Sequence, residues 1–289
     1  MTLIFVPTPL GNLGDVTLRA LEALRGATLI VAEDTRVARK LLHALDIPAP
    51  ELWSYREQNA AAVTARILER ARSERVAVTT DAGMPGISDP GAELVAAARA
   101  GGIEIVVLPG PSAAFGVAAL SGFPLQRFSF EGFPARTSGA RRRQFLDALR
   151  GGRTTVWFES PRRIRAALAD LTAVAPEAAV FLVREYTKLH EQQLAGTPQS
   201  VGAALGPSVK GEIAFAIAPL ALQPEPDAAS DADIGALLAR GLRVADVAKT
   251  LAKEGRGDRN ELYARAGALK RARDAKGEGA PSPEPLAER

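Results

Sequence analysis

Short apolar runs alternate with amphipathic segments through the first part of the chain. The apolar runs are typical of buried strands, and the segments between them repeat apolar residues at helical spacing. Strands are predicted at 3–6, 28–32, 76–79 and 103–108, with a weaker one at 52–55, and helices at 16–25 after Asp15, 35–45, 60–73 and 91–100. Strands that alternate with helices form parallel sheets, so residues 1–113 are predicted to be an α/β domain.

Residues 114–222 are predicted to form a second α/β domain. Ser112 is expected to cap a helix of small residues that runs to about Leu120, and Ser160 with Pro161 to cap a later one. Strands are predicted at 128–133, 154–159, 179–184, 190–195 and 213–217, and helices at 138–149 and 162–171. These strands are expected to pair more locally than the earlier ones, so a mixed sheet with helices beside it is predicted.

A Pro-rich segment at 223–227 is predicted to be a linker to a helical extension at 228–270. Helices are predicted there at 232–240, 244–253 and 260–269, and their spacing resembles a small helix-turn-helix bundle. Residues 271–289, rich in Lys, Arg, Gly, Pro and Glu, are predicted to be a disordered tail. The expected fold class is therefore α/β, with two α/β domains and a small helical extension.

Gly, Pro and acidic residues collect in the loops that follow the strands of the first domain. These loops are 7–15, 33–36, the central loop at 81–91 (DAGMPGISDPG) and 109–113. In the central loop, Asp89 and Pro90 are predicted to begin the next helix. A connecting turn would explain any one loop alone. However, the carboxyl ends of parallel strands share one edge of the sheet, and the helix-to-strand connections at 25–27 and 73–75, at the other edge, are less rich in Gly, Pro and acidic residues. A binding site at the carboxyl edge is therefore favoured.

The residues of these loops exclude several kinds of site. No Lys follows the glycines of the central loop, and neither GxGxxG after a strand nor GxxxxGK[ST] occurs, so nucleotide-phosphate sites lose their main support. The chain has no Cys and two His, which excludes disulfides and thiolate catalysis and argues against a zinc site or a Ser-His-Asp triad. What remains is a cation-free pocket that suits a sulfonium methyl donor attached to adenosine.

Basic residues are concentrated locally, although the net charge is only +3. RNA contact and ordinary surface solvation both account for such clusters, and charge alone leaves both open. No apolar run is long enough to span a bilayer and no basic leader precedes the first strand, so a cytoplasmic protein is expected.

Seven motifs occur in order along the chain: VPTPLGNLGD, AEDTR, DAGMPGISDPG, LPGPSA, FEGF, ESPRR and KGE. Together they resemble the tetrapyrrole methylase superfamily, from about Leu3 to Ala218, and within it the enzymes that methylate small-subunit ribosomal RNA. The resemblance implies the class III S-adenosylmethionine methyltransferase fold. It also implies methyl transfer from S-adenosylmethionine to the ribose 2′-hydroxyl of a cytidine in the decoding region of 16S rRNA, by a homodimer. No metal site is expected.

The resemblance places the donor between the two domains. The positions that match the family motifs are Pro9, Leu10, Gly11, Asp81, Ala82, Gly83, Pro85, Ser112, Ala113, Glu159, Ser160, Gly211 and Glu212. Met84 stands where the family commonly has threonine, which puts a hydroxyl contact there in doubt.

Two further sets of candidates rest on residue type and position. Asp34, Arg36 and Lys188 are candidates for catalysis, because they are polar residues near strand ends that could orient a hydroxyl. The candidates for RNA binding are Arg141, Arg142, Arg143, Arg162, Arg163, Arg243, Lys249, Lys253 and Arg256. The alternative for each catalytic candidate taken singly is a surface ion pair or a helix cap, and for the basic clusters it is surface solvation.

Two other functions stay open. The first is methylation of a tetrapyrrole or corrin precursor, whose carboxylates would also attract arginines; the helical extension argues against it. The second is a non-enzymatic regulator that binds nucleic acid through its helix-turn-helix and uses the α/β part as an effector sensor. Catalytic turnover would distinguish an enzyme from such a sensor.

Overall fold

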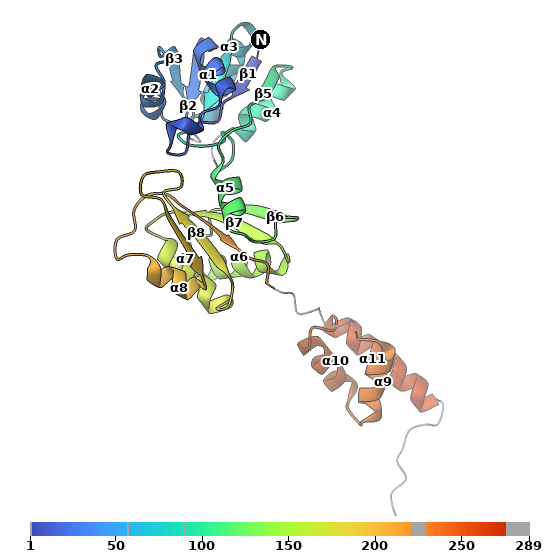
Figure 1. Cartoon of the computed structure of the whole chain (residues 1–289). Helices are drawn as coiled ribbons and strands as arrows, with labels where there is room; N and C mark the ends of the chain where they lie inside the picture. The colour runs from blue at the N-terminus through green and yellow to red at the C-terminus, as the bar shows by residue number, and fades with distance from the viewer. Residues whose placement is uncertain (1, 57, 89–90, 221–228, 276–289) are drawn as a thin grey trace, which may run out of the picture. The chain divides into compact units, whose positions relative to one another are not determined.

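The computed structural model describes residues 2–56, 58–88, 91–220 and 229–275. The chain divides into two compact units, residues 1–220 and 221–289. The first unit contains two five-stranded sheets, and the described residues of the second are helical (Figure 1). No helix in these described ranges has both the length and the apolar character that a membrane crossing requires.

The first sheet is parallel throughout, with the strand order β3-β2-β4-β1-β5. Its strands are β1 (Thr2–Phe5), β2 (Leu29–Ala32), β3 (Glu51–Ser54), β4 (Val76–Thr79) and β5 (Glu104–Val107). The helices between them are α1 (Leu18–Gly26), α2 (Thr35–Ala44), α3 (Ala60–Ser73) and α4 (Ala92–Ala100). The prediction of a parallel α/β sheet is confirmed.

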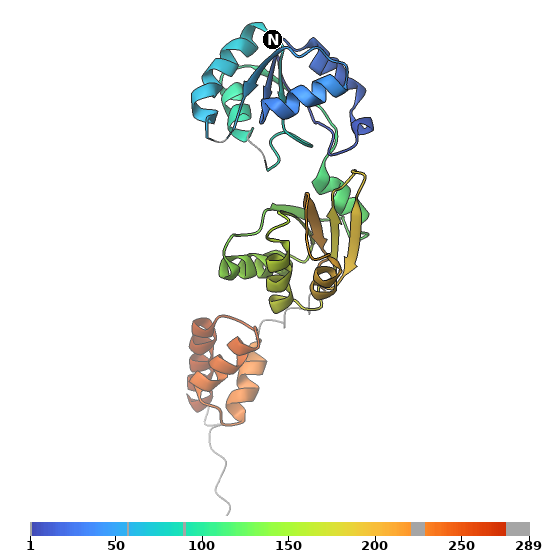
Figure 2. The ribbon, with the colours of Figure 1, turned by 90° about the vertical axis from the view of Figure 1, so that its left-hand side faces the viewer.

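Helices cover both faces of this sheet (Figure 2). Leu3 and Phe5 of β1 pack with α3 and α4, whereas Ile4 packs with α1 and α2, because successive side chains of a strand point to opposite faces. Burial of both faces explains why the three central strands, β1, β2 and β4, consist almost entirely of apolar residues. The loops after the strands emerge at one edge, where they are free to form a site.

The second sheet is mixed, as predicted, with the strand order β6-β7-β10-β8-β9; β6 and β7 are parallel and the other neighbours antiparallel. Its strands are β6 (Phe128–Gly132), β7 (Thr154–Glu159), β8 (Val180–Arg184), β9 (Gln192–Gly196) and β10 (Ile213–Ile217). One face packs against α6 (Ser138–Arg150), α7 (Ile164–Val174) and α8 (Pro198–Ala204). The other face packs against α5 (Ala113–Leu120).

Two helices begin later than predicted. Asp15 does not cap α1, because it ends the short 3-10 helix η1 (Leu13–Asp15); the cap is Thr17, whose hydroxyl accepts a hydrogen bond from the Ala20 N–H at 3.1 Å. Ser160 and Pro161 lie in the turn before α7 and do not cap it, because that helix starts only at Ile164.

The starts of three further elements differ from the predictions or lie partly outside the described residues. Ser112 occupies the predicted N-cap position of α5, but its side chain makes no capping bond. β9 starts at Gln192, two residues after the predicted His190, because residues 185–191 form a turn. The helix start predicted at Asp89 and Pro90 lies outside the described residues, and the described α4 has Gly91 at its N-cap position.

The described residues of the second unit form α9 (Asp231–Ala239), α10 (Val244–Lys253) and α11 (Arg259–Ala275). They pack around buried apolar side chains that include Ile234, Val247, Leu251 and Leu262. α11 is longer than predicted, so residues 271–275 are helical and do not belong to the predicted tail. The predicted linker at 223–227 and the rest of the tail, 276–289, lie outside the described residues.

Candidate functional site

A cavity of about 500 Å³ opens between the loops of the two sheets in the first unit. Its lining comes from the loops after β1 and β4, the start of α5, the end of β7 and residues 211–214. The predicted donor-binding residues that line it are Leu10, Ala82, Gly83, Ser112, Ala113, Glu159, Ser160, Gly211 and Glu212. Segments far apart in the sequence thus meet around one space.

The predicted donor-binding residues that do not line the cavity are Pro9, Gly11, Asp81 and Pro85. Gly11 lies against Lys188, because a Cβ at position 11 would stand 2.2 Å from Cγ of Lys188. The Asp81 carboxylate accepts a hydrogen bond from the Asp34 N–H at 3.1 Å. Partial burial and the negative charge of Glu33 raise the pKa of Asp81. Gly11 and Asp81 therefore connect the loops that frame the cavity.

Gly83 joins the central loop to the loop after β1. Its N–H donates to the Thr8 carbonyl at 3.0 Å, and its carbonyl accepts from the Thr8 N–H at 2.9 Å. Its φ of +84° is in the left-handed region that favours glycine, and a Cβ there would stand 3.0 Å from Cδ2 of Leu10. This side of the cavity therefore depends on a residue without a side chain.

The described residues that line the cavity include three glutamates and no Lys or Arg. Glu33 accepts a hydrogen bond from the Thr80 hydroxyl at 2.9 Å. Glu159 is buried, and its Oε1 accepts from the Ser160 N–H at 2.7 Å. Its Oε2 lies 3.2 Å from Nη2 of Arg163 but makes no hydrogen bond. Carboxylate oxygens among small and apolar side chains favour a positively charged ligand, such as a sulfonium, over a phosphate.

Neither Asp34 nor Arg36, two of the catalytic candidates, lines the cavity. Asp34 caps α2 by accepting from the Arg36 N–H at 2.9 Å, and its carboxylate pairs with the guanidinium groups of Arg36 at 2.6 Å and Arg56 at 3.2 Å. The hydrogen bonds from Arg36 hold the pKa of Asp34 well below its usual range. Asp34 is therefore a poor general base near neutral pH.

Lys188, the third catalytic candidate, is held between two carboxylates. Its Nζ donates to Glu185 Oε1 at 3.0 Å and to Glu212 Oε2 at 2.7 Å. Burial opposes the charge of Lys188, but the two hydrogen bonds outweigh that effect and raise its pKa. Lys188 is therefore protonated near neutral pH and takes no proton from a hydroxyl.

The carboxylate of Glu185 explains why glycine occupies position 211. Glu185 Oε1 also accepts a hydrogen bond from the Glu212 N–H at 2.9 Å. A Cβ on Gly211, whose φ is +86°, would stand 2.1 Å from that same oxygen. Glycine at this position lets the Glu185 carboxylate hold Glu212 at the cavity wall.

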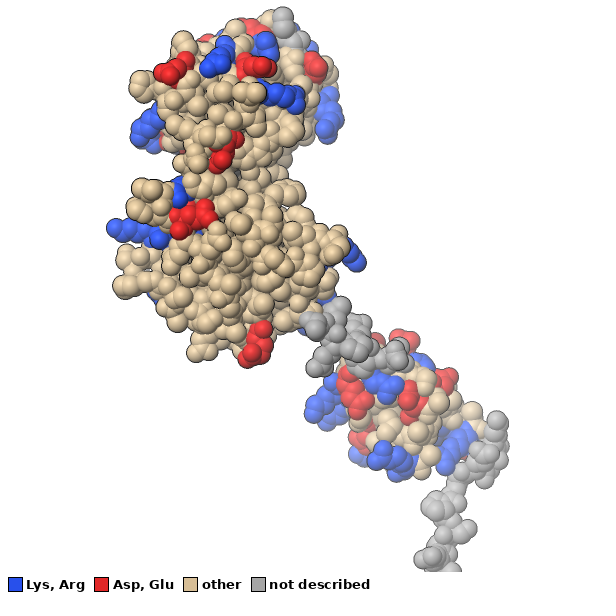
Figure 3. Space-filling view, in the orientation of Figure 1, with Lys and Arg blue, Asp and Glu red and all other residues tan. Residues whose placement is uncertain are grey.

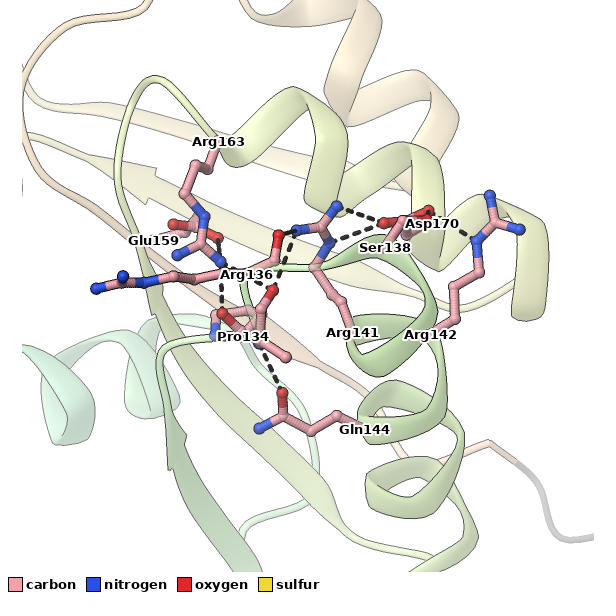
Figure 4. A network of polar contacts seen from close by, with 10 residues as sticks. Pro134, Arg136, Ser138, Arg141, Arg142, Gln144, Glu159, Arg163 and Asp170 are labelled. Carbon is pink, nitrogen blue, oxygen red and sulfur yellow. Dashed lines mark hydrogen bonds and ion pairs between the residues drawn. The ribbon is translucent and has the colours of Figure 1, made fainter.

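Arg141, predicted to bind RNA, is buried and is not available to a phosphate in this structure. It is 5% exposed, and its Nε donates to Asp170 Oδ2 at 2.8 Å (Figure 4). Arg142 binds the other carboxylate oxygen, Oδ1, at 2.7 Å, and Arg143 is exposed. Three successive arginines on a helix point in different directions. One of them faces the interior, where it needs a carboxylate.

The other RNA-binding candidates lie in several environments. Arg162, Lys249 and Lys253 are exposed, and Arg163 is half-buried. In the helical unit, Arg243 pairs with Asp246 at 2.9 Å and Arg256 pairs with Asp233 at 2.6 Å. Figure 3 shows basic and acidic side chains interspersed over this unit.

Part of the cavity lining was not among the predicted donor contacts. Glu33, Met84, Ile87 and Ser88 lie in loops that were predicted to form the binding edge, but they were not assigned to the donor. The other lining residues that were not predicted are Phe133, Phe158, Pro161, Val183, Tyr186, Ile213 and Ala214. The FEGF motif contains Phe133 and was a usable signal. Phe158, Val183 and Ala214 share the sheet face that packs with α5. Strand alternation identifies such a face only when the order of the strands is known.

Comparison with known proteins gives the same family at the level of sequence and of fold. Residues 2–202 match the family model of the Tetrapyrrole (Corrin/Porphyrin) Methylases. The chain is 38% identical over 268 residues to "Ribosomal RNA small subunit methyltransferase I" of Synechocystis sp., covering 90% of this chain and 95% of that protein. The protein of the same name from Thermotoga maritima is 45% identical over 196 residues, covering 67% of this chain and 87% of that one.

Solved structures support the fold. A diphthine synthase aligns with a TM-score of 0.60 at 16% identity and covers 75% of this chain and 90% of its own. A cobalt precorrin-4 methyltransferase aligns with a TM-score of 0.58 at 19% identity, covering 74% of this chain and 94% of its own. The chain therefore belongs to the tetrapyrrole methylase family, within the group whose members are named ribosomal RNA small subunit methyltransferase I.

Proposed function

We propose that this methyltransferase transfers a methyl group from S-adenosylmethionine to the ribose 2′-hydroxyl of a cytidine in the decoding region of 16S rRNA. The main support is the similarity over 90% of the chain to a protein named as a methyltransferase of small-subunit ribosomal RNA. The cavity adds chemical support, because its wall carries carboxylates and suits a sulfonium.

The residues around the cavity fit this donor. A space of about 500 Å³ is within the usual range for a cofactor pocket. Leu10, Gly83 and Ala113 would hold the donor through close backbone and apolar contacts. Glu159 brings a buried carboxylate whose Oε2 pairs with Arg163 at 3.2 Å but makes no hydrogen bond. S-adenosylmethionine would supply an electrophilic methyl group on a positively charged sulfur.

The chain's own contribution to the reaction is chiefly positioning. A ribose hydroxyl is a weak acid, and Asp34, ionised between two arginines, and Lys188, protonated between two glutamates, are both poor proton acceptors. Holding the ribose hydroxyl close to the donor lowers the barrier. Transfer of the methyl group to the oxygen would release S-adenosylhomocysteine, and the hydroxyl proton would pass to solvent water. Lys188 supports this geometry by holding Glu212 at the cavity wall.

A tetrapyrrole or corrin substrate is less well supported. The relatives that are 38% and 45% identical carry the name of a ribosomal RNA methyltransferase, whereas the precorrin methyltransferase is 19% identical and supports the fold alone. A non-enzymatic regulator is disfavoured by membership in a methyltransferase group.

The test is methyl transfer from labelled S-adenosylmethionine to small ribosomal subunits, to naked 16S rRNA and to a corrin precursor. We expect label in the RNA, at the 2′-oxygen of one cytidine, located by digestion and mass spectrometry. Label in the corrin precursor alone would overturn the assignment. Donor binding without transfer to any of the three would favour the sensor function.

Ending the chain after Pro226 is expected to separate donor binding from RNA binding. The cavity lies in residues 1–220, so donor affinity should be nearly unchanged. RNA affinity should fall because Lys249, Lys253 and their neighbours are lost, and the logarithmic salt slope should decrease by roughly 0.7 to 0.9 for each lost phosphate contact. Donor calorimetry and RNA titrations at several salt concentrations measure both. An unchanged slope in a donor-competent truncation would show that the helical unit does not bind RNA.

We further propose that the protein acts in the cytoplasm as a homodimer. Exposed apolar side chains support self-association: Leu18 is 79% exposed, Phe115 67% and Leu189 93%. Sedimentation equilibrium measures the mass directly, and a monomer at enzyme concentrations that support full activity would contradict the dimer.

A further inference from the structure

The loop at residues 133–136, between β6 and α6, carries an aromatic ring at the cavity. The register of β6 against β7 shifts between Phe130 and Gly132, and Gly132 has a φ of +70°. Irregularities of this kind re-aim a side chain at the end of a strand. Phe133 follows directly; it lines the cavity, and its ring is 5.8 Å from that of Phe158 in an edge-on arrangement.

Two arginines, Arg141 on α6 and Arg163 at the N-cap position of α7, hold the backbone of this loop (Figure 4). Arg141 Nη1 donates to the carbonyls of Ala135 at 3.1 Å and Arg136 at 3.3 Å. Arg163 Nη2 donates to the carbonyls of Pro134 and Ala135. Arg163 also pairs with Glu159 of the cavity wall. The position of the loop is therefore fixed relative to the cavity.

The side chains at the two ends of the loop remain available to a ligand. Phe133 is 52% exposed, so part of its ring faces outward. The exposed guanidinium of Arg136 makes no hydrogen bond or ion pair with any residue that the structure describes. In Figure 4 it points away from Arg141 and Asp170. An exposed aromatic ring can stack on the base of a nucleotide, and a guanidinium without a partner among the described residues can bind its phosphate. The loop holds one of each.

The donor is a poorer match for this loop. The loops after β1 and β4 and the start of α5 already supply Leu10, Gly83 and Ala113 to one part of the lining. Phe133 comes from the other sheet and is more than half exposed, as expected for a residue that meets a second molecule entering from outside. A fixed aromatic ring loses little freedom when a base stacks on it.

We propose that the 133–136 loop binds the acceptor nucleotide: Phe133 stacks on the base of the target nucleotide and Arg136 binds a neighbouring phosphate. The proposal rests on the proposed function, because it takes the acceptor to be RNA. Phe133 and Arg136 are positioning residues for the acceptor.

Substitutions at position 133 test the stacking. Phe133→Leu keeps an apolar side chain but removes the aromatic face, whereas Phe133→Trp keeps that face. We expect Phe133→Leu to raise the KM for small ribosomal subunits roughly tenfold, since the loss of one base stacked on an aromatic side chain weakens binding by roughly fivefold to a hundredfold. Phe133→Trp should stay within about threefold of the wild type by the same argument. Donor affinity, measured by calorimetry, should be unchanged in both variants and serves as the folding control.

Substitutions at position 136 test the phosphate contact. Arg136→Ala should raise the same KM and reduce the logarithmic salt slope of RNA binding by roughly 0.7 to 0.9, whereas Arg136→Lys should keep the slope. The control is Arg150→Ala on α6, whose exposed side chain pairs with Asp147; it should change neither quantity.

The outcomes separate the two proposals. A wild-type enzyme that methylates no RNA would refute the proposed function. A wild-type enzyme that methylates RNA, with a normal KM in Phe133→Leu and Arg136→Ala, would refute the loop proposal alone. Weaker donor binding with an unchanged KM for RNA in Phe133→Leu would also refute it, by assigning the ring to the donor site.

Discussion

Replacing Gly83 by valine is expected to reduce the affinity for S-adenosylmethionine at least a hundredfold. Gly83 lines the cavity with a φ of +84°, and a Cβ would stand 3.0 Å from Cδ2 of Leu10 and 3.7 Å from the Pro111 carbonyl oxygen. A β-branched side chain would add two methyl groups in this space and would force the loop from its left-handed conformation. The two backbone hydrogen bonds between residue 83 and Thr8 would be strained. Calorimetric titration with the donor measures the loss.

The matched control is Gly102→Val. Gly102 also has a left-handed φ, +66°, but no heavy atom lies within 4 Å of its Cβ position, and it does not line the cavity. Both variants carry the backbone strain of a left-handed residue, about 1–2 kcal/mol. Only Gly83→Val should lose the donor. Equal donor affinity in the two folded variants would remove the central loop from the binding site.

The sequence predicted the parts of the fold that depend on local pattern. Alternation of apolar runs and amphipathic segments was sufficient for the parallel sheet, and the Gly- and Pro-rich loops indicated its functional edge. The family resemblance then assigned Ala82 and Gly83 of the central loop to donor binding, and both line the cavity. The sequence offered two possible N-caps for α1, and the prediction of Asp15 was wrong. Thr17 caps α1, because Asp15 is already part of η1.

The features that sequence reasoning missed depend on contacts between distant segments. Arg141 looked like one of three surface arginines, and only the packing of α6 on α7 brings it to Asp170. The same holds for Phe158 and Val183, which reach the cavity because β7 and β8 flank β10 in the sheet. The spacing of residues along the sequence does not specify which strands become neighbours in the sheet, because strand order is a property of the tertiary structure.

The ion pair of Arg141 and Asp170 should make a large contribution to stability. Both side chains are 6% exposed. Asp170→Asn keeps the shape but leaves the guanidinium of Arg141 without a counter-charge in the interior. Breaking a buried pair on one side costs about 3–5 kcal/mol of unfolding free energy. Urea denaturation of the variant, followed by circular dichroism, is expected to show this loss.

The pH dependence of stability provides a second readout of the same pair. Burial opposes the ionisation of Asp170, but hydrogen bonds from Ser138, Arg142 and Arg141 outweigh it and lower the pKa of Asp170. A lowered pKa in the folded state means that its contribution is fully present above the ordinary aspartate pKa and is lost as the pH falls through the lowered value. The stability difference between wild type and Asp170→Asn should therefore be constant near neutral pH and shrink in acid.

The control for this prediction is Asp147→Asn on α6. Asp147 pairs with Arg150 at 3.2 Å, but the two side chains are 72% and 76% exposed, and exposed pairs contribute at most about 1 kcal/mol. A double variant, Arg141→Met with Asp170→Leu, removes both charges and should recover much of the stability, because apolar residues often replace a buried pair without loss. The recovery should be incomplete, since Arg141 also holds the carbonyls of Ala135 and Arg136. If Asp170→Asn were no less stable than Asp147→Asn, the buried pair would not stabilise the second sheet's helices, and the fixed position of the 133–136 loop would need another cause.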